Sequence, residues 1–278
     1  MENTSGQMLL QPFCKINIGL DILRRREDSF HDIDTLMVPV HGLHDTLEIE
    51  RTEGTGIRFD TVGLEVDCAT DRNLVVRAWM LMRQRYGIGG TRITLRKSIP
   101  FGAGLGGGSA DAAFTVRGLN GLFGLGLGVA EMRAIASELG SDVPFFITDA
   151  PMFCRGRGEI IVPSDIDMSG LWCVVTKPPF GIPTAEAYSL VMPHKPSVPL
   201  ERRIAEPIAK WQTTIVNDFE WPLMDKYPTL RNLKNNLIRC GAVYASLSGS
   251  GSALYGLFTE KPDYKPILKD ETVSVSVL

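Results

Sequence analysis

The chain has 278 residues, of which 44% are hydrophobic and 22% charged, so it can bury a full core and two domains are expected. Its net charge of −3 argues against anionic partners that would bind through bulk positive charge on the protein. We therefore expect neither a nucleic acid nor a membrane as a partner. Five scattered cysteines, never spaced C-x-x-C, indicate neither a disulfide framework nor a zinc site, and the absence of a signal-peptide pattern or a long apolar run predicts a cytoplasmic protein.

The first clear element is an alternating segment over residues 13–23, which predicts a strand with one buried face. Lys15 and Asn17 lie on the opposite face, about 7 Å apart by strand geometry. This spacing suits two groups that bind one polar ligand. A solvated strand face is the alternative interpretation.

Further strands are predicted over residues 44–52 and 91–99. In the second of these, Lys97 shares the face of Ile93 and Leu95, so its ammonium should emerge from the apolar side just before a glycine-rich segment. A lysine that extends along the apolar surface to water is the alternative.

Three helices are predicted in the first half of the chain, and their ends are marked by capping residues. They cover residues 74–86 with Asn73 as N-cap, residues 109–122 with Ser109 as N-cap, and residues 129–139 ended by Gly140 in the C′ position.

The proline-bearing stretch 160–170 changes the character of the sequence, so we place a domain boundary near residue 163, giving domains 1–163 and 164–278. A strand over 171–178, a helix capped by Thr184 and an amphipathic helix over 228–241 follow. Residues 242–258 predict two strands around a loop of small residues. The mixed order of strands and helices favours the α+β class over a doubly wound sheet.

The glycine-rich segment has five glycines in the seven positions 102–108 and runs directly into a predicted helix. Such a density favours a tightly bent backbone or the close approach of a ligand, and free N–H groups at a helix start suit a polyphosphate. The dinucleotide fingerprint is matched only literally, because no second parallel strand with an acidic residue follows. The Walker A lysine and the protein-kinase motifs are missing from the sequence.

Three motifs carry a resemblance to a known family. They are Lys15 with Asn17 on the first strand, P-x-x-x-G-L-G from Pro100 to Gly106, and the small-residue loop 246–251. Together they resemble the GHMP kinases, a superfamily of small-molecule kinases. Residues 15–37, "LGSDVPFF", "GIPTAEAY" and the Asn-Asp pair at 217–218 are similar to the subfamily of 4-diphosphocytidyl-2-C-methyl-D-erythritol kinases.

The resemblance implies a role for each matching residue. It implies catalysis by Lys15 and Asp142, with the lysine stabilising a substrate alkoxide and the aspartate orienting or deprotonating the hydroxyl. The residues implied in ATP binding are Asn73, Leu74, Lys97, Pro100, Gly102, Gly104, Leu105, Gly106, Gly107, Gly108 and Ser109. Those implied in substrate binding are Asn17, Phe30, His31, Thr184 and Tyr188.

Each of these roles has a structural alternative. Asn73 is also suited to cap a helix, and Asp142 to a turn before Pro144. The aromatic residues Phe30 and Tyr188 are of a kind that often serves packing, although the resemblance implies that they sandwich a cytosine whose edge His31 contacts. No cluster of Mg²⁺ ligands stands out, so Mg²⁺ is expected to travel mainly on ATP, with Ser109 as a candidate contact.

The sequence departs from the subfamily at a few positions. Phe30 stands where a tyrosine is usual and Ser29 where a glycine is usual. Cys14 replaces a common alanine, and loop 246–251 has serines where threonine is common. The change at Phe30 keeps the aromatic surface but removes a phenolic hydroxyl.

The resemblance implies a two-domain fold, with an N-terminal domain like ribosomal protein S5 domain 2 and a ferredoxin-like C-terminal domain. It further implies transfer of a phosphoryl group from ATP to the 2-hydroxyl of 4-diphosphocytidyl-2-C-methyl-D-erythritol, in non-mevalonate isoprenoid biosynthesis, by a monomer or homodimer. The alternatives are a GHMP kinase for a mevalonate- or homoserine-like alcohol, a non-catalytic nucleotide-binding regulator and, more remotely, a dinucleotide oxidoreductase.

Overall fold

The computed structural model describes residues 2–4, 6–66, 68–264 and 272–278. The chain forms two compact units that alternate along the sequence. The first unit contains Met1–Cys14, His44–Phe101 and Gly106–Asp149, and the second contains Lys15–Leu43, Gly102–Leu105 and Ala150–Leu278. These units are defined by contacts, and the division into family domains near residue 163 stays a prediction.

The first unit is built on a five-stranded sheet of order β1-β2-β5-β7-β6. Only the β6–β7 pair is parallel among these described strands; β1–β2, β2–β5 and β5–β7 are antiparallel. The strands are β1 (Glu2–Thr4), β2 (Gln7–Leu10), β5 (Thr46–Arg51), β6 (Ile57–Gly63) and β7 (Thr91–Lys97).

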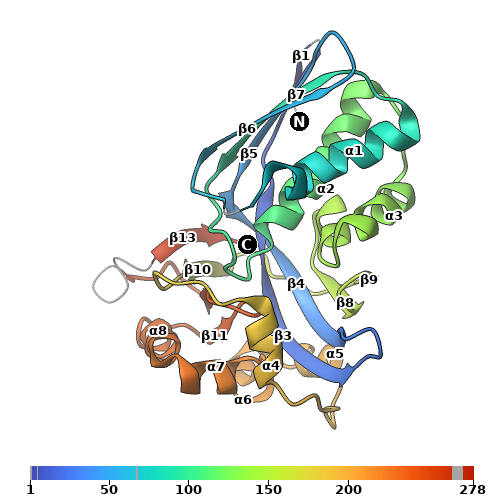
Figure 1. The fold of residues 1–278 in the computed structure, drawn as a ribbon. Coiled ribbons are helices and arrows are strands. Elements are labelled where there is room, and N and C mark those ends of the chain that lie inside the picture. Colours follow the sequence, from blue (N-terminus) through green and yellow to red (C-terminus); the bar gives the residue numbers. More distant parts are fainter. Residues whose placement is uncertain (1, 5, 67, 265–271) are drawn as a thin grey trace. The chain divides into compact units, whose positions relative to one another are not determined.

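Helices cover one face of this sheet, with α2 packed on β2 and β5 and with α1 and α3 beside α2 (Figure 1). Their bounds are α1 (Leu74–Tyr86), α2 (Gly107–Phe123) and α3 (Val129–Leu139), with short 3₁₀ turns η1 (Thr70–Arg72) and η2 (Val143–Ile147). The apolar face of β5 and β7 alternates as strand periodicity requires, with Leu47, Ile49, Ile93 and Leu95 all buried.

The second unit contains two four-stranded sheets, of order β3-β4-β8-β9 and β11-β12-β10-β13. Their strands are β3 (Phe13–Arg25), β4 (His31–His44), β8 (Met152–Gly156), β9 (Ile160–Pro163), β10 (Trp172–Thr176), β11 (Tyr244–Leu247), β12 (Leu254–Phe258) and β13 (Thr272–Val277). The helices of this unit are α4 (Thr184–Leu190), α5 (Leu200–Ile204), α6 (Ile208–Thr214), α7 (Glu220–Lys226) and α8 (Pro228–Arg239). Figure 1 shows α7 and α8 side by side below the second sheet, and α8 packs on β11 and β12.

The amphipathic helix predicted over 228–241 is confirmed as α8, whose Leu230, Leu233 and Leu237 enter the core of the second unit. The same core includes Leu20 and Ile22 of β3. The sheet β3-β4-β8-β9 therefore contributes to the same core as the helices that pack on the sheet β11-β12-β10-β13. The two strands predicted around a small-residue loop are confirmed as β11 and β12.

Four local predictions need correction or qualification. Strand β3 is buried on both faces over Phe13–Ile22, because its polar face packs against other segments of the second unit. Helix α2 starts two residues earlier than predicted, with Gly106 as N-cap, so Ser109 lies inside its first turn. Helix α4 begins at Thr184 with Pro183 as its cap. Gly140 does end α3, but with extended backbone at φ 171° rather than the left-handed C′ conformation.

Two predicted helices have the bounds that their caps indicated. Helix α1 follows Asn73, whose side-chain oxygen accepts a hydrogen bond from Val75 N at 2.9 Å. Helix α3 spans the predicted 129–139. Across the described residues, no helix combines the length and the apolar character needed to cross a bilayer.

Candidate functional site

Lys15 and Asn17 form the centre of a polar cluster in the second unit. Both residues belong to β3, and they are only 2% and 1% exposed, so neither lies on a solvated strand face. Lys15 Nζ donates to Asn17 Oδ1, and Asn17 Nδ2 donates to Thr35 Oγ1 of β4 at 3.1 Å. A buried polar group needs such partners, and here they fix the direction of the ammonium.

The same ammonium holds the glycine-rich segment. Lys15 Nζ donates to Gly104 O at 2.7 Å, and Lys15 N donates to Leu105 O at 3.0 Å. Ala253 N donates to Ala103 O at 3.0 Å. Three successive carbonyl oxygens, those of residues 103–105, are therefore bonded to other parts of the protein. They point toward β3 and toward the chain around Ala253.

Gly104 is a position where a side chain has no room. A Cβ there would lie 2.0 Å from Ser248 O, and its φ of +78° is in the left-handed region. Ser248 Oγ also donates to Gly104 O at 2.9 Å. The glycine-rich segment and the loop 246–251 thus pack backbone against backbone.

Asn217 fixes the loop 246–251 from the other side. Its Nδ2 donates to Leu247 O and to Gly249 O, both at 2.9 Å, and Asn217 is fully buried. A Cβ on Gly249 would lie 3.2 Å from Lys15 Nζ. Within the second unit, the structure therefore brings together all three motifs that the sequence suggested: Lys15, the Gly102–Leu105 segment and the loop 246–251.

The glycine-rich segment continues into α2 in the first unit. Gly106 has a left-handed φ of +73°, and Ala110 N donates to its carbonyl oxygen at 2.9 Å. Residues 107–109 form the first turn of α2, where helix geometry leaves the backbone N–H groups without partners inside the helix. Such a helix start favours an anion. Pro100 precedes the turn, and Ser109 is half-buried.

Asp142, Asn73 and Leu74 also belong to the first unit. Asp142 is half-buried and immediately precedes the 3₁₀ turn η2, whose cap it forms without a side-chain hydrogen bond to that turn. Asn73 caps α1 with its amide oxygen. Its structural role is confirmed, while its role toward a ligand stays a prediction.

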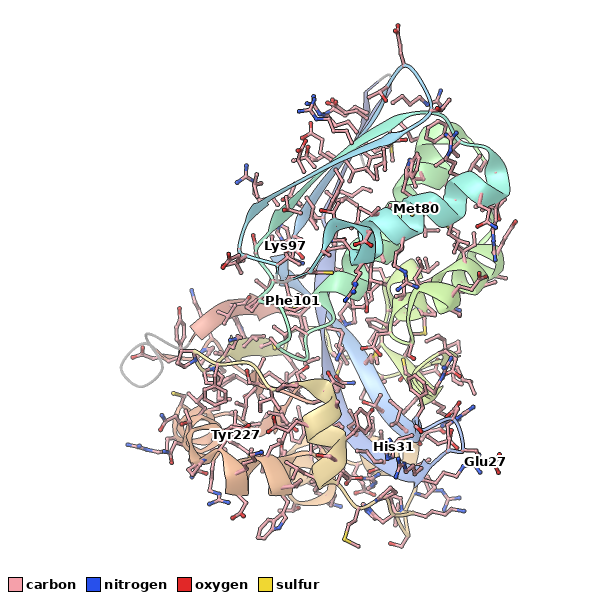
Figure 2. All side chains as sticks on the ribbon, in the orientation of Figure 1. Glu27, His31, Met80, Lys97, Phe101 and Tyr227 are labelled. Carbon is pink, nitrogen blue, oxygen red and sulfur yellow. The ribbon has the colours of Figure 1, made fainter. Side chains whose placement is uncertain are left out.

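Lys97 does not emerge into solvent. It is the last residue of β7 (Figure 2). Only 5% of the residue is exposed. Its Nζ donates to Asp45 Oδ2 and to Asp111 Oδ2, the latter at 2.7 Å. The alternative of a lysine extending to water is therefore wrong, because two buried carboxylates hold its charge inside.

The residues predicted to bind a flat ring lie in the second unit. His31, labelled in Figure 2, lies at the start of β4. Its ring stacks on Tyr188 of α4 with centroids 4.8 Å apart and planes 21° from parallel. Burial, with the charge of Arg25 second, lowers the pKa of His31, which favours the neutral imidazole. Phe30 is 52% exposed, with the Arg157 guanidinium 4.9 Å from its ring centroid.

Thr184 is exposed, and its Oγ1 lies 3.5 Å from Ser250 Oγ of the loop 246–251. Tyr188 stacks on His31, and the predicted sandwich of a cytosine between Phe30 and Tyr188 stays a prediction. Ser248, Asn217 and Thr35 were given no role from the sequence. Ser248 had a signal in the small-residue loop, but nothing local to Thr35 indicates that it faces Asn17.

Comparison with known proteins adds a family to this geometry. A model of the GHMP kinases N terminal domain matches residues 73–150, and one of the GHMP kinases C terminal region matches residues 209–268. A 4-diphosphocytidyl-2-C-methyl-D-erythritol kinase of Azobacteroides pseudotrichonymphae is 42% identical over 261 residues, covering 94% of this chain and 96% of the relative. The chain belongs to the GHMP kinase family.

A second relative of this GHMP kinase, from Parabacteroides distasonis and of the same printed name, is 41% identical and covers 92% of this chain and 93% of its own length. A crystal structure of 4-(cytidine 5'-diphospho)-2C-methyl-D-erythritol kinase matches with a TM-score of 0.79 at 33% identity, covering 93% of this chain and 92% of the other. The mevalonate kinase of Methanococcus jannaschii, with a TM-score of 0.68 at 13% identity and 99% and 98% coverage, shares the fold. The predicted α+β GHMP kinase fold is confirmed.

Proposed function

We propose that this GHMP kinase transfers the γ-phosphoryl group of ATP to the 2-hydroxyl of 4-diphosphocytidyl-2-C-methyl-D-erythritol, in the non-mevalonate route to isoprenoid precursors. The observation that carries the proposal is the convergence of three motifs on the buried Lys15 ammonium in the second unit. The two relatives that match this chain at 42% and 41% identity over more than nine-tenths of its length bear the name of that kinase.

ATP binding is assigned to the glycine-rich segment and the start of α2. The residues are Pro100, Gly102, Gly104, Leu105, Gly106, Gly107, Gly108 and Ser109. Because the carbonyl oxygens of Ala103, Gly104 and Leu105 are bonded to the protein, the phosphates meet N–H groups rather than carbonyl lone pairs. The free N–H groups and positive dipole end of α2 add to this attraction.

The adenosine of ATP is assigned to Asn73 and Leu74, and Lys97, which lies near them in this assignment, contributes to ATP affinity. Capping of α1 uses the amide oxygen of Asn73, so its amide nitrogen is the donor that we assign to the base. Leu74 supplies apolar surface at the start of α1.

The substrate hydroxyl is assigned to Lys15 and Asp142. Phosphoryl transfer has a loose transition state, so the protein acts mainly by placing the groups and by stabilising charge. In this scheme Asp142 orients the 2-hydroxyl and accepts its proton as the oxygen attacks the γ-phosphorus, while the bond from that phosphorus to the β,γ-bridging oxygen breaks and ADP leaves. Lys15, held by Asn17 and Gly104 O, stabilises the negative charge that develops on the reacting oxygens.

The cytidine end of the substrate is assigned to Phe30, His31, Thr184 and Tyr188. A neutral His31 can donate from one ring nitrogen and accept at the other, which matches the mixed edge of cytosine. The aromatic surfaces of Phe30 and Tyr188 are suited to packing against a flat base.

Mg²⁺ is proposed to enter with ATP. Among the residues that the structure describes, no three His, Cys, Asp or Glu side chains are grouped to hold a metal ion. The Ser109 hydroxyl, in the first turn of α2, is the oxygen that we assign as a contact to the metal, which prefers such hard ligands. Bound with the nucleotide, the ion would neutralise charge on the phosphate oxygens.

A direct competition of substrates tests the proposal. The purified chain is incubated with Mg²⁺-ATP and, in parallel, with the cytidine substrate, mevalonate and homoserine, and phosphorylated product is measured by mass spectrometry. We expect product only from the cytidine substrate. Product from mevalonate or homoserine would assign a different alcohol, and ATP binding without any product would indicate a regulator.

A further inference from the structure

Three buried charged side chains lie together in the first unit, outside the cluster around Lys15. They are Asp45, just before β5, Lys97, at the end of β7, and Asp111, near the start of α2. Their side chains are 0%, 4% and 4% exposed. A buried group of this kind is retained only where each charge is paired.

Asp45 fixes the direction in which the chain leaves β7. Its Oδ1 accepts hydrogen bonds from Ser98 N at 2.6 Å and from Ile99 N at 2.9 Å, and its Oδ2 accepts one from Lys97 Nζ. Backbone donors on two consecutive residues therefore point at one carboxylate. Ser98 and Ile99, which lead from β7 toward the glycine-rich segment, therefore have little conformational freedom.

Lys97 carries this constraint across to α2. Its Nζ donates to Asp111 Oδ2 at 2.7 Å, and a Cβ on Gly107 would lie only 3.3 Å from the same Nζ. That Cβ would also lie 2.9 Å from Ile99 Cγ2. The segment that follows β7 and the first residue of α2 are in close contact, and the ammonium lies beside that contact.

The charges of the cluster are strongly coupled. Burial would lower the pKa of Lys97, but Asp111 and Asp45 outweigh it and the net shift is upward, so the ammonium stays protonated. Burial, reinforced by Asp45 and opposed by Lys97, raises the pKa of Asp111 to about 8. Asp111 Oδ1 has no hydrogen-bond partner among the described residues, so one oxygen of this carboxyl contributes no link.

We propose that Asp45, Lys97 and Asp111 form a positioning unit that fixes the end of β7 against the start of α2 and so holds the first-turn N–H groups of α2 ready for the phosphates of ATP. This inference rests on the proposed function. Lys97 then acts through the two carboxylates rather than by touching the nucleotide, and Asp45, which is fully buried, is as important for ATP affinity as Lys97. The three are positioning residues, not catalytic ones.

The test measures equilibrium binding of ATP and steady-state kinetics in variants of the full chain. Lys97→Met removes the bridge, Asp111→Leu removes its acceptor on α2, and Asp45→Asn places a donor toward the ammonium. Because displaced N–H groups lose their hydrogen bonds to the charged phosphates, we expect each variant to weaken ATP binding by at least about tenfold. The KM of the alcohol substrate should stay within about twofold of wild type.

Asp111→Asn is the conservative variant. Its amide oxygen can still accept from Lys97, and its nitrogen replaces the oxygen that has no partner, so ATP binding should stay within about threefold of wild type. Arg51→Met is the matched control for a purely structural loss. Arg51 binds Leu122 O at the far end of the same helix α2 and lies over the Phe123 ring, so its loss should lower Tm and leave ATP binding unchanged.

Several outcomes overturn the inference. They are wild-type ATP affinity in folded Lys97→Met and Asp111→Leu, loss of affinity in Lys97→Met alone, which would mean direct contact with ATP, and an equal loss in Arg51→Met. If single variants do not fold, the combined variant Asp45→Asn/Lys97→Met/Asp111→Leu removes all three charges at once, a change that proteins often tolerate. It should fold and still bind ATP weakly, and restored affinity would contradict the proposal. Failure of the wild-type chain to bind ATP would instead refute the proposed function.

Discussion

The two halves of the glycine-rich segment are held by different means. In the first half, Gly102–Leu105, the carbonyl oxygens of residues 103–105 are bonded directly, by Lys15, Ser248 and Ala253. At the start of α2 the backbone is fixed indirectly, through side-chain charges on Asp45, Lys97 and Asp111. We therefore expect the first half to depend on close backbone packing, so that one added methyl group disturbs it, and the second half to depend on a charge balance that responds to pH.

The largest expected effect is on catalysis by Lys15 and Asp142. Asp142→Asn should keep the shape of the site and lower kcat by about 10²–10⁴-fold, the range usual for a general base. Lys15→Ala should lose a comparable factor, and the double variant should be scarcely worse than the poorer single one, because groups that act together are not additive. Steady-state kinetics at saturating substrate measure all three.

Lys15→Ala also removes one of the two donors to Gly104 O, so of these two single variants it alone should raise the KM for ATP. This difference separates the holding role of Lys15 from its catalytic role. Multiplicative losses in the double variant would mean independent roles. A kcat near that of wild type for Asp142→Asn would indicate that Asp142 has only a structural role in the turn before η2.

The next effect is on stability, and it compares two glycines of the first half. Gly104→Ala places a Cβ 2.0 Å from Ser248 O, whereas a Cβ on Gly102 meets nothing within 4 Å, and both residues have left-handed φ. Gly102→Ala should lose only the conformational cost, about 1–2 kcal/mol of unfolding free energy. Gly104→Ala should lose about 2–5 kcal/mol, since overpacking adds to that cost.

Urea denaturation of both glycine variants gives these two losses under one condition. Equal losses would mean that the loop 246–251 moves aside, and the first half would then not depend on close packing. In folded Gly104→Ala, kcat/KM for ATP should fall by on the order of 10²-fold, because the N–H groups of the segment are displaced.

Much of this organisation was predictable from the sequence. The rest was not predictable, because it depends on contacts between residues that lie far apart in the chain. Local signals are complete in α1 and α3, where Asn73 and Gly140 mark the ends, and in α8, where leucines recur at helical spacing. The partners of Lys97 are 52 and 14 residues away, and no periodicity connects them. The same holds for Ser248 and Gly104, which are 144 residues apart.

The burial of β3 was missed because alternation describes only one strand at a time. From the sequence alone, the polar face of β3 is expected to contact solvent, because the segments that cover it come from distant parts of the chain. Lys15 and Asn17 became recognisable as a site from the family motif, but their partners Thr35 and Gly104 O follow from tertiary packing alone. Ser29 shows the opposite case, since its φ of +67° agrees with the glycine usual at that position in the subfamily.

A smaller effect should distinguish the second half by its response to pH. The pKa of Asp111 is raised to about 8 in the folded protein by burial, with Asp45 adding and Lys97 opposing. Between the unfolded value near 3.8 and about 8, the folded state therefore holds an extra proton, and this contribution to the free energy of unfolding falls as pH rises. Above about pH 8 it changes no further.

The difference in unfolding free energy between wild type and Asp111→Asn isolates this contribution. The buried Asp21 in the second unit, with a pKa raised to about 6 by burial, affects both proteins alike and cancels. We expect the wild type to lose stability relative to Asp111→Asn from pH 5 to about pH 8 and the difference then to level off. Parallel curves across this range would show that Asp111 has an ordinary pKa and that the second half is not held by a charge balance.

The smallest effect concerns the hydroxyl that supports the first half. Ser248→Ala removes one of two donors to Gly104 O and should lower the unfolding free energy by about 1 kcal/mol, the net worth of one hydrogen bond. Because Lys15 still holds the same oxygen, the KM for ATP should rise only about threefold. Ser252→Ala is the matched control: Ser252 is also fully buried, but its Oγ donates to Phe180 O at 2.6 Å. It should lose a similar stability and leave the KM for ATP unchanged. An equal rise in KM in both variants would mean that the whole loop, rather than the bond to Gly104 O, sets the position of the first half.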